Sequence, residues 1–566
     1  MTHRLRALLA LFLTLALVAA ACGGDDDDGE AADDADTEAA SEEEAADDSD
    51  DEPADAGDEG SDEGDAAAVS GDPVPGGTLV IGSTQVPRHL NGTVQSGYAT
   101  AVPGTQLNAS PLLYDSEWNP QPYLAESWEV ADDGLSVTLN LVQNAVFHDG
   151  EPITSEDVKF SIETAQAHHP FKPMFAPVTT VDTPDDHTAV INLSQPHPAI
   201  LLAMSPGLLP VIPEHIFNDG QEMPTHPRNT EDFVGSGPFQ LVEYNPESVI
   251  RMQRFDDFFI EGRPYLDEIV MEISPDPSTI VLGLENGTTH LSAAVPTADL
   301  VRMQDNPDLL VTSDGHEAIG QIQWIEFNMA DPVLAVKEVR QAIAYALDRN
   351  FVVDALDQGL TNPALTGIAP QSPFYNGTVE SYEQDIEKAK QLLADAGFAE
   401  GDIELTIEYI PGSAALTSYA EYAVQAVEEI GINLSLNPAP DFPTWAQRIS
   451  GGEFQMTTNN VWNWGDPVIG VHRTYLSTNR VGVIWTNNTG YENAEVDSLL
   501  EQAGQTFDEA ERADLYAQFQ DIVAEEVPIY FINNPPFWQV YQPEVQNPPI
   551  TVWGHMSPMH ETWLAP

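Results

Sequence analysis

The sequence predicts an α/β protein whose folded part contains more than one lobe. Between residues 403 and 436, an alternating apolar strand, a helical pattern and a second short apolar strand follow one another. Such a unit implies two parallel strands joined by a right-handed crossover, which is how α/β lobes are built. The chain has 566 residues. Roughly 490 of them follow an acidic N-terminal region, which is enough for two or three lobes with sizeable cores.

The remaining elements are predicted from the spacing of apolar residues, which is close to two in strands and 3.6 in helices. A strand at 76–82 and a hairpin over 126–148 come first. Thr154 and Asp157 then have the spacing of a capping box, in which side chains and backbone amides at the start of a helix satisfy each other. Further helices are expected at 339–359, 385–396, 415–430, 492–505 and 508–525, and a last strand at 528–532.

The first 21 residues have the features of a cleaved signal peptide. Arg4 and Arg6 form a short positive region, and the apolar run after them is shorter than the roughly 20 residues that a membrane-spanning helix needs. The run ends in alanines before Cys22, the only cysteine of the chain. This stretch resembles a bacterial lipobox, although Ala19 replaces the usual leucine. We therefore expect Cys22 to be lipidated; the alternative is ordinary cleavage that leaves it as a free thiol.

Residues 22–74 are expected to form a disordered acidic spacer behind the lipid anchor. Between Asp25 and Asp65 the sequence contains 23 Asp or Glu residues and no Lys or Arg. Such a segment cannot bury enough apolar surface to offset the entropy of ordering, and its charges repel one another. A calcium loop is disfavoured, because the regular ligand spacing and the closing Glu are missing.

The chain as a whole is strongly acidic. It has 92 Asp and Glu residues against 19 Lys and Arg residues, which gives a formal net charge of −73. A surface of this kind repels nucleic-acid phosphates and anionic membrane surfaces, so no nucleic-acid partner is expected. Because salt screens the repulsion between surface charges, the composition suggests a saline habitat and a halophilic surface.

Several short blocks of the body resemble one known family. The blocks are Leu124 to Val130 with Asp133-Gly134, Phe147 to Pro152 with Glu156 to Val158, Gly235 to Phe239, Val339 to Ala342 with Ala344 to Arg349, and Ala389-Lys390 with Leu392-Leu393 and Ala396-Gly397. In this order they are similar to the family 5 extracellular solute-binding proteins of ABC importers, the dipeptide-, oligopeptide- and nickel-binding group.

The resemblance implies a periplasmic-binding-protein-like fold of type II, with two α/β lobes, a hinge and an extra inserted domain, the three-domain arrangement called cluster C. By analogy, lobe I comprises residues 75–118, 235–322 and 535–566, the inserted domain 119–234, and lobe II 323–534. The chain then crosses the hinge near Ile322-Gln323-Trp324 and again near Asn533-Asn534. The resemblance further implies that a solute binds between the lobes and closes them, and that the permease recognises the closed form.

Candidate ligand-binding residues lie on both lobes. In peptide-binding relatives a carboxylate just before an Asp-Pro segment anchors the free ammonium group of the peptide through a strong charge-assisted hydrogen bond. Asn463 takes that position here, so either Asp466 serves instead or the ligand has no free α-ammonium group. Trp324, Trp462 and Trp464 are expected either to wall a pocket for a side chain or sugar ring or to fill the lobe cores. The full predicted set is Ser83, Thr84 and Gln85 after the opening strand, Trp324, Asn328, Trp462, Asn463, Trp464 and Asp466.

The sequence leaves other solutes and other protein classes open. The resemblance favours an oligopeptide or dipeptide, with an oligosaccharide or chelated nickel as the alternative. Nickel is disfavoured because His168-His169 and His472 lack the spacing of a metal site. A secreted hydrolase is a further alternative, but no Gly-x-Ser-x-Gly or His-Glu-x-x-His motif supports it. We expect no catalytic residue, metal site or cofactor. The expected protein is a monomer on the outer face of the cell membrane, or in the periplasm, with an ABC permease as its partner.

Overall fold

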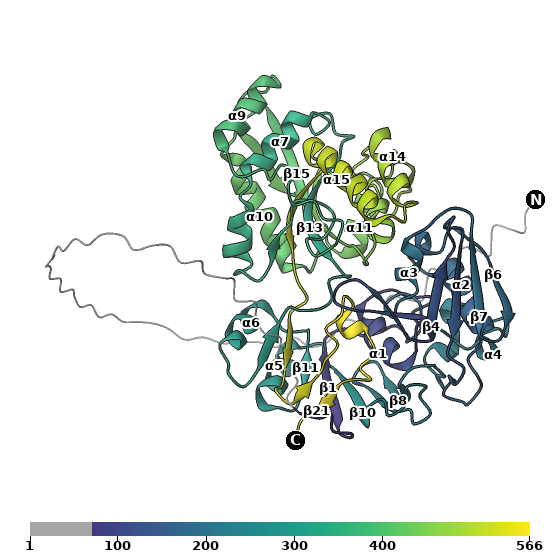
Figure 1. The fold of residues 1–566 in the computed structure, drawn as a ribbon. Coiled ribbons are helices and arrows are strands. Elements are labelled where there is room, and N and C mark those ends of the chain that lie inside the picture. The colour runs from purple at the N-terminus through teal and green to yellow at the C-terminus, as the bar shows by residue number, and fades with distance from the viewer. Residues whose placement is uncertain (1–70) are drawn as a thin grey trace, which may run out of the picture. The chain divides into compact units, whose positions relative to one another are not determined.

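The structure, a computed structural model, describes residues 71–566. The predicted signal peptide at 1–21, Cys22 and most of the predicted spacer at 22–74 lie outside the described residues. Three sheets of four or more strands organise the described part (Figure 1). Within residues 71–566, none of the helices combines the length and the apolar character that crossing a membrane requires.

The region that we call the first lobe is built on a seven-stranded sheet in the order β12-β19-β11-β1-β10-β9-β8. Its strands are β1 (Thr78–Ser83), β8 (Phe239–Asn245), β9 (Val249–Arg254), β10 (Glu268–Ile273), β11 (Leu291–Ser292), β12 (Leu310–Thr312) and β19 (Gln539–Tyr541). The opening strand β1 is parallel to β10 and β11, whereas β8, β9 and β10 are antiparallel. The helices of this lobe are α1 (Tyr98–Leu107), α5 (Pro277–Asn286) and α6 (Thr297–Gln304).

The region predicted to be the inserted domain, which we call by that name, contains a four-stranded antiparallel sheet in the order β4-β5-β7-β6. Its elements are β4 (Ala125–Val130), β5 (Ser136–Leu141), α2 (Ser155–His168), η1 (Lys172–Met174), β6 (Val178–Asp185), β7 (Thr188–Leu193), α3 (Ala199–Ala203), α4 (Glu214–Phe217), η2 (Met223–Thr225) and η3 (Pro227–Asn229). The predicted capping box is present, since the backbone amide of Thr154 donates to Asp157 Oδ2 at 2.9 Å. Most buried apolar residues of this domain and of the first lobe form one continuous core, and two smaller clusters lie apart from it.

The second lobe is built on a six-stranded sheet in the order β14-β18-β13-β17-β15-β16. Its strands are β13 (Gln321–Phe327), β14 (Asn362–Pro363), β15 (Ile403–Glu408), β16 (Ile432–Leu436), β17 (Met456–Trp462) and β18 (Ile529–Asn534). β15 and β16 are parallel and α10 (Ala414–Glu428) connects them, which confirms the predicted strand–helix–strand unit. β13 begins at Gln321, slightly before the predicted start of lobe II at residue 323.

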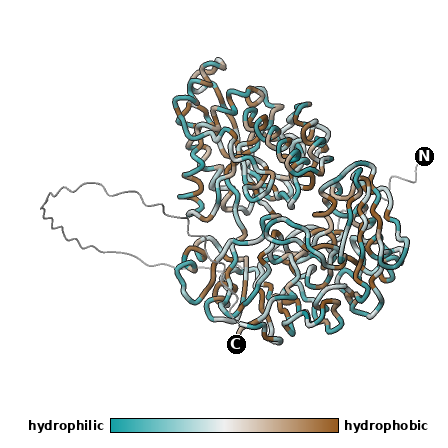
Figure 2. Tube along the Cα trace, in the orientation of Figure 1, coloured by the Kyte–Doolittle hydropathy of each residue, from teal (hydrophilic) through white to brown (hydrophobic). Residues whose placement is uncertain are grey.

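Both faces of the second sheet are buried. Along β13, Ile325 and Phe327 belong to one core and Trp324 belongs to another, as the two-residue period of a strand requires. Figure 2 shows hydrophobic segments, in brown, along the chain through both the upper and the lower part of the described structure. The helices of this lobe are α7 (Lys337–Ala346), α8 (Arg349–Phe351), η4 (Val352–Leu356), α9 (Ile386–Asp395), α11 (Phe442–Ser450), α12 (Pro467–Gly470), α13 (His472–Tyr475), η5 (Ser477–Asn479), α14 (Ala494–Ala503) and α15 (Glu509–Glu526).

The helix predicted over 339–359 is divided into three pieces. α7 ends at Ala346, and Asp348 then caps α8 by accepting a hydrogen bond from the backbone amide of Phe351 at 3.1 Å. The last piece, η4, is a π-helical turn that ends before Gly359. Two small sheets and one 3-10 turn complete the structure: β2 (Leu112–Tyr114) with β3 (Pro120–Pro122), β20 (Val545–Gln546) with β21 (Trp563–Leu564), and η6 (Gly554–Met556).

Candidate functional site

The chain passes between the sheets of the first and second lobes at two neighbouring points. Gly320, directly before β13, has a φ of +50°, and a Cβ there would come within about 3 Å of two side-chain carbons. The position therefore favours glycine. On the return, Pro535 and Pro536 separate β18 of the second sheet from β19 of the first. The side-chain amide of Asn534 donates to the backbone oxygen of Gln321 at 2.7 Å, so the two crossings are tied together.

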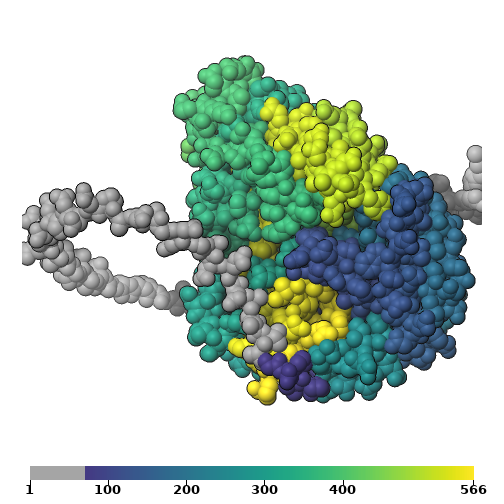
Figure 3. Space-filling model, in the orientation of Figure 1, coloured from purple at the N-terminus to yellow at the C-terminus, as the bar shows by residue number. Residues whose placement is uncertain are grey.

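A cavity of 440 Å³ lies beside the two crossings. Ligand pockets in proteins commonly measure about 300 to 1,000 Å³, so this volume suits a small solute. The space-filling view shows a hollow between the green surface of the second lobe and the teal surface of the first lobe (Figure 3). The lining residues are Ala293, Val295, Thr297 and Leu300 of the first lobe, Gln321 and Gln323 of β13, Leu356, Asp357, Gln358, Leu360, Thr361, Ala414, Ala415, Ser418 and Tyr419 of the second lobe, and Pro535, Pro536, Phe537 and Trp538 of the return crossing.

One carboxylate, that of Asp357, is the only charged group among the described residues that line this cavity. Asp357 follows the π-helical turn η4 and is 8% exposed. The hydroxyl of Tyr419 donates to its Oδ1 at 2.6 Å, and the hydroxyl of Thr361 donates to its Oδ2 at 2.8 Å. The amide of Asn533 also donates to Oδ2. All three donors are neutral, so within residues 71–566 no Lys or Arg side chain forms an ion pair with Asp357.

Tyr419 remains a hydrogen-bond donor to this carboxylate over the whole physiological range of pH. Burial raises the pKa of its hydroxyl, and the neighbouring charge of Asp357 raises the pKa further. The phenol therefore stays protonated and uncharged. It donates a hydrogen bond to the carboxylate but carries no positive charge to offset the negative one.

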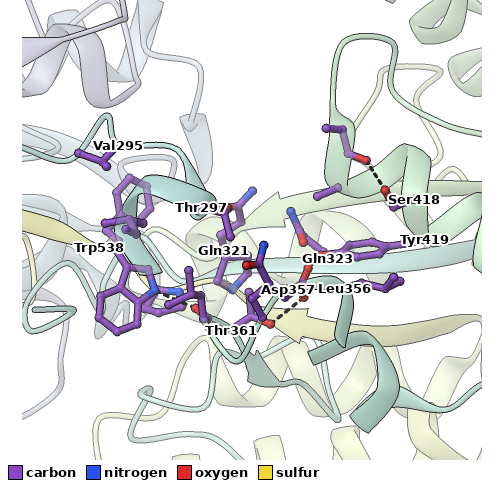
Figure 4. Close-up of a pocket in the computed structure, with 18 of the residues that line it drawn as sticks. Val295, Thr297, Gln321, Gln323, Leu356, Asp357, Thr361, Ser418, Tyr419 and Trp538 are labelled. Carbon is purple, nitrogen blue, oxygen red and sulfur yellow. Dashed lines mark hydrogen bonds between the residues drawn. The ribbon is translucent and has the colours of Figure 1, made fainter. Parts of the chain in front are cut away.

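Gln323 on β13 brings a second acceptor to the same end of the cavity. It is paired with Asn533 across the neighbouring strands β13 and β18, and Asn533 in turn donates to Asp357. The Oε1 atom of Gln323 is buried and has no hydrogen-bond donor among the described residues. Buried polar atoms are nearly always paired, so this acceptor is an exception within the described residues. Figure 4 shows Gln323, Asp357 and Tyr419 together on one side of the cavity.

The opposite side of the cavity is apolar and aromatic. Trp538 is held by a hydrogen bond from its Nε1 to the backbone oxygen of Leu360 at 2.8 Å, so its ring is fixed on the wall. Val295 and Trp538 lie across the cavity from Tyr419 and Ser418 (Figure 4). The site therefore combines one acidic end with apolar, aromatic and neutral polar side chains.

The three predicted residues of the first lobe lie at the end of β1 and do not line this cavity. Ser83 Oγ accepts a hydrogen bond from the backbone amide of Gln85 at 3.1 Å and so closes a local turn. Ser83 is buried, Thr84 is half-buried and Gln85 is exposed. Ligand contact by these residues stays a prediction.

Trp324 and Asn328 have structural positions in the second lobe. Trp324 is 1% exposed, packs edge-on against Phe531, and donates from Nε1 to Glu326 Oε1 at 2.8 Å. It therefore fills a core and does not wall the cavity, because the alternation of β13 turns its ring to the face opposite that of Ile325 and Phe327. The side-chain amide of Asn328 donates to the backbone oxygen of Phe454 at 2.7 Å. This hydrogen bond joins two loops.

Trp462 and Trp464 do not share a strand face, contrary to the expectation from their spacing. β17 ends at Trp462, and Trp464 has a φ of +52°, which turns the chain. Trp462 meets Trp485 edge-on, whereas Trp464 joins the core of the first lobe beside Phe171 and Trp553. The Trp464 ring thus connects the second lobe to the core of the first.

Asn463 and Asp466 are both engaged within the protein. The amide group of Asn463 accepts from the backbone of Ala369 at 2.7 Å and donates to the oxygen of Gly367 at 3.0 Å. Asp466 forms a buried ion pair with Arg512, with 2.7 Å between Oδ1 and Nη2. Burial acts to raise the pKa of Asp466, but the charge of Arg512 and its hydrogen bond outweigh burial, and the pKa lies below its usual value. Asp466 is therefore ionised and already compensated.

The residues that form the charged end of the cavity were not found from the sequence. Only Gln323 and Asn533 had a signal, because they lie in the two predicted hinge crossings. Asp357 and Tyr419 are 62 residues apart, and Asp357 and Asn533 are 176 apart. No local pattern relates such positions. In addition, residues 71–566 contain no group of three or more His, Cys, Asp or Glu side chains arranged to hold a metal ion.

Comparison with known proteins agrees with the arrangement of sheets and crossings. The model of the bacterial extracellular solute-binding proteins, family 5 Middle, matches residues 119–482, which is more than half of the chain. Heme-binding protein A of Haemophilus influenzae is 29% identical over 466 residues, which cover 76% of this chain and 83% of that protein. The glutathione-binding protein GsiB of Salmonella typhi is 27% identical over 424 residues, or 73% of this chain and 80% of that protein.

A solved structure of a similar protein has the same fold as this chain. The ABC transporter substrate-binding protein CtaP of Listeria monocytogenes superposes with a TM-score of 0.75 at 27% identity, covering 87% of this chain and 99% of that one. The likeness extends over both lobes and the inserted domain, and the cavity lies where the chain crosses between the lobes. The chain therefore belongs to family 5 of the bacterial extracellular solute-binding proteins, the solute-binding components of ABC importers.

Proposed function

We propose that this protein captures a small peptide in the cavity beside the two crossings and delivers it to an ABC permease. The observation that carries the proposal is the composition of the cavity wall. Side chains of the first lobe, of the second lobe and of both crossing segments all line it. A solute held there contacts both lobes at once, which is the requirement for a ligand that controls their closure. The relative GsiB supports a peptide, because glutathione is itself a tripeptide.

The proposed mechanism is closure about the two crossings. Gly320, which has no Cβ, absorbs part of the change of angle, and the pairing of Asn534 with Gln321 keeps the crossings together. The solute shifts the population toward the closed form by the difference between its affinities for the two forms. The permease then recognises the closed form. No bond of the solute is made or broken, so the protein is not an enzyme.

The N-terminal region completes the proposal. Residues 1–21 act as an export signal, Cys22 carries the lipid, and the acidic segment that follows spaces the lobes from the outer face of the membrane. Replacing Cys22 by Ser removes the acceptor of the lipid. In the expressing cells, the C22S chain is expected in the soluble extracytoplasmic fraction, whereas the unchanged chain stays with the membranes. Membrane retention of the C22S chain would contradict lipid anchoring.

The solute-binding function is tested by thermal unfolding of the purified chain with a panel of di- and tripeptides at high salt. A ligand at about a hundred times its dissociation constant stabilises the folded state by about 2.7 kcal/mol. We expect a rise in melting temperature together with a smaller radius of gyration in X-ray scattering, and unchanged peptides in chromatography afterwards. Stabilisation without a change in radius would contradict the closure mechanism, and peptide cleavage would indicate a hydrolase.

A further inference from the structure

A separate cavity lies where the inserted domain meets the second lobe. Its volume is 380 Å³, which is within the usual range of small-molecule sites. The inserted domain contributes η1 and the segment 195–197, and the second lobe contributes α12, α13 and part of α14. The cavity shares no lining residue with the cavity at the crossings or with the cavity that Asp466 lines. It is therefore not part of the site described above.

Two cations line this cavity, although the chain as a whole is strongly acidic. Arg473 lies on α13 of the second lobe, and Lys172 begins η1 of the inserted domain. The two segments are in contact, since the Cζ atom of Arg473 lies 5.5 Å from the ring centre of Phe171, the residue before Lys172. Within the described part of the chain, the exposed Glu501 is the one carboxylate that lines the cavity, and it forms no ion pair with either cation.

The guanidinium of Arg473 is only partly used by the protein. Its Nε donates to the backbone oxygen of Gly470 at 3.1 Å, and its Nη2 donates to that of Trp462 at 3.2 Å. Within residues 71–566, Nη1 has no acceptor, and it remains accessible to solvent. Arg340 also lacks a carboxylate partner among these residues, but all three of its nitrogens donate to backbone oxygens. Arg473 therefore differs from a purely structural arginine in keeping a donor for a group outside the chain.

The positive charge of Arg473 also lacks a compensating charge. Burial lowers its pKa to about 10, and no neighbouring carboxylate opposes this shift. Burial acts to lower the pKa of Arg512 as well, but there the charge of Asp466 outweighs burial and the pKa is raised. The two histidines of the cavity add no charge, because burial lowers the pKa of His197, and lowers that of His472 to about 3. At neutral pH the positive charge of the wall therefore comes from its arginine and its lysine.

We propose that this cavity binds a small dicarboxylate, with one carboxylate on Arg473 and the other on Lys172. A guanidinium fork matches the two oxygens of a carboxylate, and an ammonium group supplies three donors of its own. Gln195, Thr478 and Gln505 line the cavity as further neutral donors. One cation belongs to the inserted domain and the other to the second lobe, so the bound dianion favours the arrangement in which the two walls face each other. The site goes beyond the proposed peptide function and does not depend on it.

Two electrostatic effects oppose binding, and they determine the conditions of the test. The net charge of −73 repels anions over long range, and Glu501 repels them locally. Salt screens the long-range repulsion. The measurements therefore use the purified full chain in sodium chloride at one fixed, high ionic strength, in a buffer without phosphate or carboxylate, and compare ligands that differ mainly in charge.

Titration calorimetry with three probes of nearly equal size tests the charge of the ligand. The probes are succinate, a dianion, succinamate, a monoanion, and succinamide, which is neutral. We expect the affinity to fall by about tenfold at each step, since each step removes one charge-assisted contact. Inorganic phosphate is expected to bind more weakly than succinate, because it is too small to span the two cations. Absent binding of succinate, equal affinity for the three probes, or tighter binding of phosphate would overturn the inference.

Matched variants then test the assigned residues. Arg473→Gln and Lys172→Gln are each expected to weaken succinate binding by about tenfold, whereas Glu501→Gln should strengthen it. Lys390→Gln makes the same change of charge at an exposed lysine outside the cavity, and is expected to alter the affinity by less than about twofold. If Arg473→Gln does not fold, Lys172→Gln decides, because Lys172 is exposed. An equal loss in Lys172→Gln and Lys390→Gln would show an effect of net charge alone and overturn the site.

Discussion

Two cavity walls of the second lobe each contain a buried aspartate, and the two aspartates are compensated in different ways. Asp466 lines a cavity of 630 Å³ and is ion-paired with Arg512 at 2.7 Å. Asp357 lines the cavity at the crossings and has neutral donors only. The difference teaches that burial of a carboxylate does not by itself indicate a binding site. A binding site is indicated by a buried charge that no oppositely charged group of the protein compensates, on a cavity wall that a solute can reach.

Glu326 is a third buried carboxylate, and its burial is compensated in a different way. It lies on β13, fully buried, with hydrogen bonds from Trp324 Nε1 at 2.8 Å and Asn459 Nδ2 at 2.9 Å. Burial raises its pKa to about 7, while the two hydrogen bonds oppose that rise. Asp466 is thus compensated by an arginine and Glu326 by a proton, whereas the hydrogen bonds to Asp357 all come from neutral donors. The following predictions test these differences in how the buried carboxylates are compensated.

The largest effect is expected for Asp466→Asn. The variant leaves the guanidinium of Arg512 buried without its partner, and breaking a buried pair in this way costs about 3–5 kcal/mol. Denaturant unfolding of both single variants and of the double variant Asp466→Asn/Arg512→Gln measures the coupling. We expect the double variant to lose clearly less than the sum of the single losses. Additive losses would show that the pair does not act as a unit.

Glu326→Gln is expected to change how stability depends on pH. The folded-state pKa of Glu326, about 7, lies above its ordinary value of 4.5. Between these values the folded state holds a proton that the unfolded state releases, so stability falls as pH rises, by at most about 3 kcal/mol. The variant lacks this titration and should lose less stability than the unchanged chain between pH 4.5 and 7. Parallel pH profiles of the two chains would contradict the prediction.

Asp357→Asn is expected to have a small effect on the chain without solute. Three hydrogen bonds to the carboxylate weaken, each worth about 0.5–1.5 kcal/mol, but the cost of burying an uncompensated charge disappears. We expect a net loss of about 1 kcal/mol or less in denaturant unfolding. A loss as large as that of Asp466→Asn would mean that Asp357 is mainly structural, and the comparison between the two walls would fail.

The smallest effect is expected at an exposed ion pair, which provides the baseline. Lys337 and Glu525 are 2.6 Å apart, and their side chains are 38% and 62% exposed. Solvent-exposed pairs contribute little, and salt screens them. Lys337→Ala should therefore lower the free energy of unfolding by about 0.5 kcal/mol or less at low salt, and by less at high salt. A larger loss that persists at high salt would contradict this interpretation.

Much of the secondary structure could be predicted because its causes are local. The capping box of Thr154 and Asp157 depends on residues three apart, and the strand–helix–strand unit over 403–436 shows its periodicity directly. The prediction of one helix over 339–359 was wrong because Asp348, an effective cap, restarts the backbone as α8 inside an otherwise helical apolar pattern. Competition between a cap and a continuing helix is decided by packing, which the pattern does not show.

The candidate site could be predicted only where it coincides with the hinge. The tryptophans at 324, 462 and 464 carried equal weight as pocket walls from their residue type. The structure distributes them differently, because the direction of each ring depends on strand register and on a single positive φ at Trp464. A side chain's surroundings follow from which segments pack against it, and residue type alone leaves that open.

The sequence by itself determined the acidic composition, the α/β character, the order of the elements and the resemblance to a solute-binding family, since these depend on composition and on short spacings along the chain. Only the tertiary structure decided which buried carboxylates have partners. Arg512 reaches Asp466 from 46 residues away, and Tyr419 and Asn533 reach Asp357 from 62 and 176 residues away. The energy of a buried charge depends on the groups within a few ångströms of it, and those groups are assembled only when the chain folds.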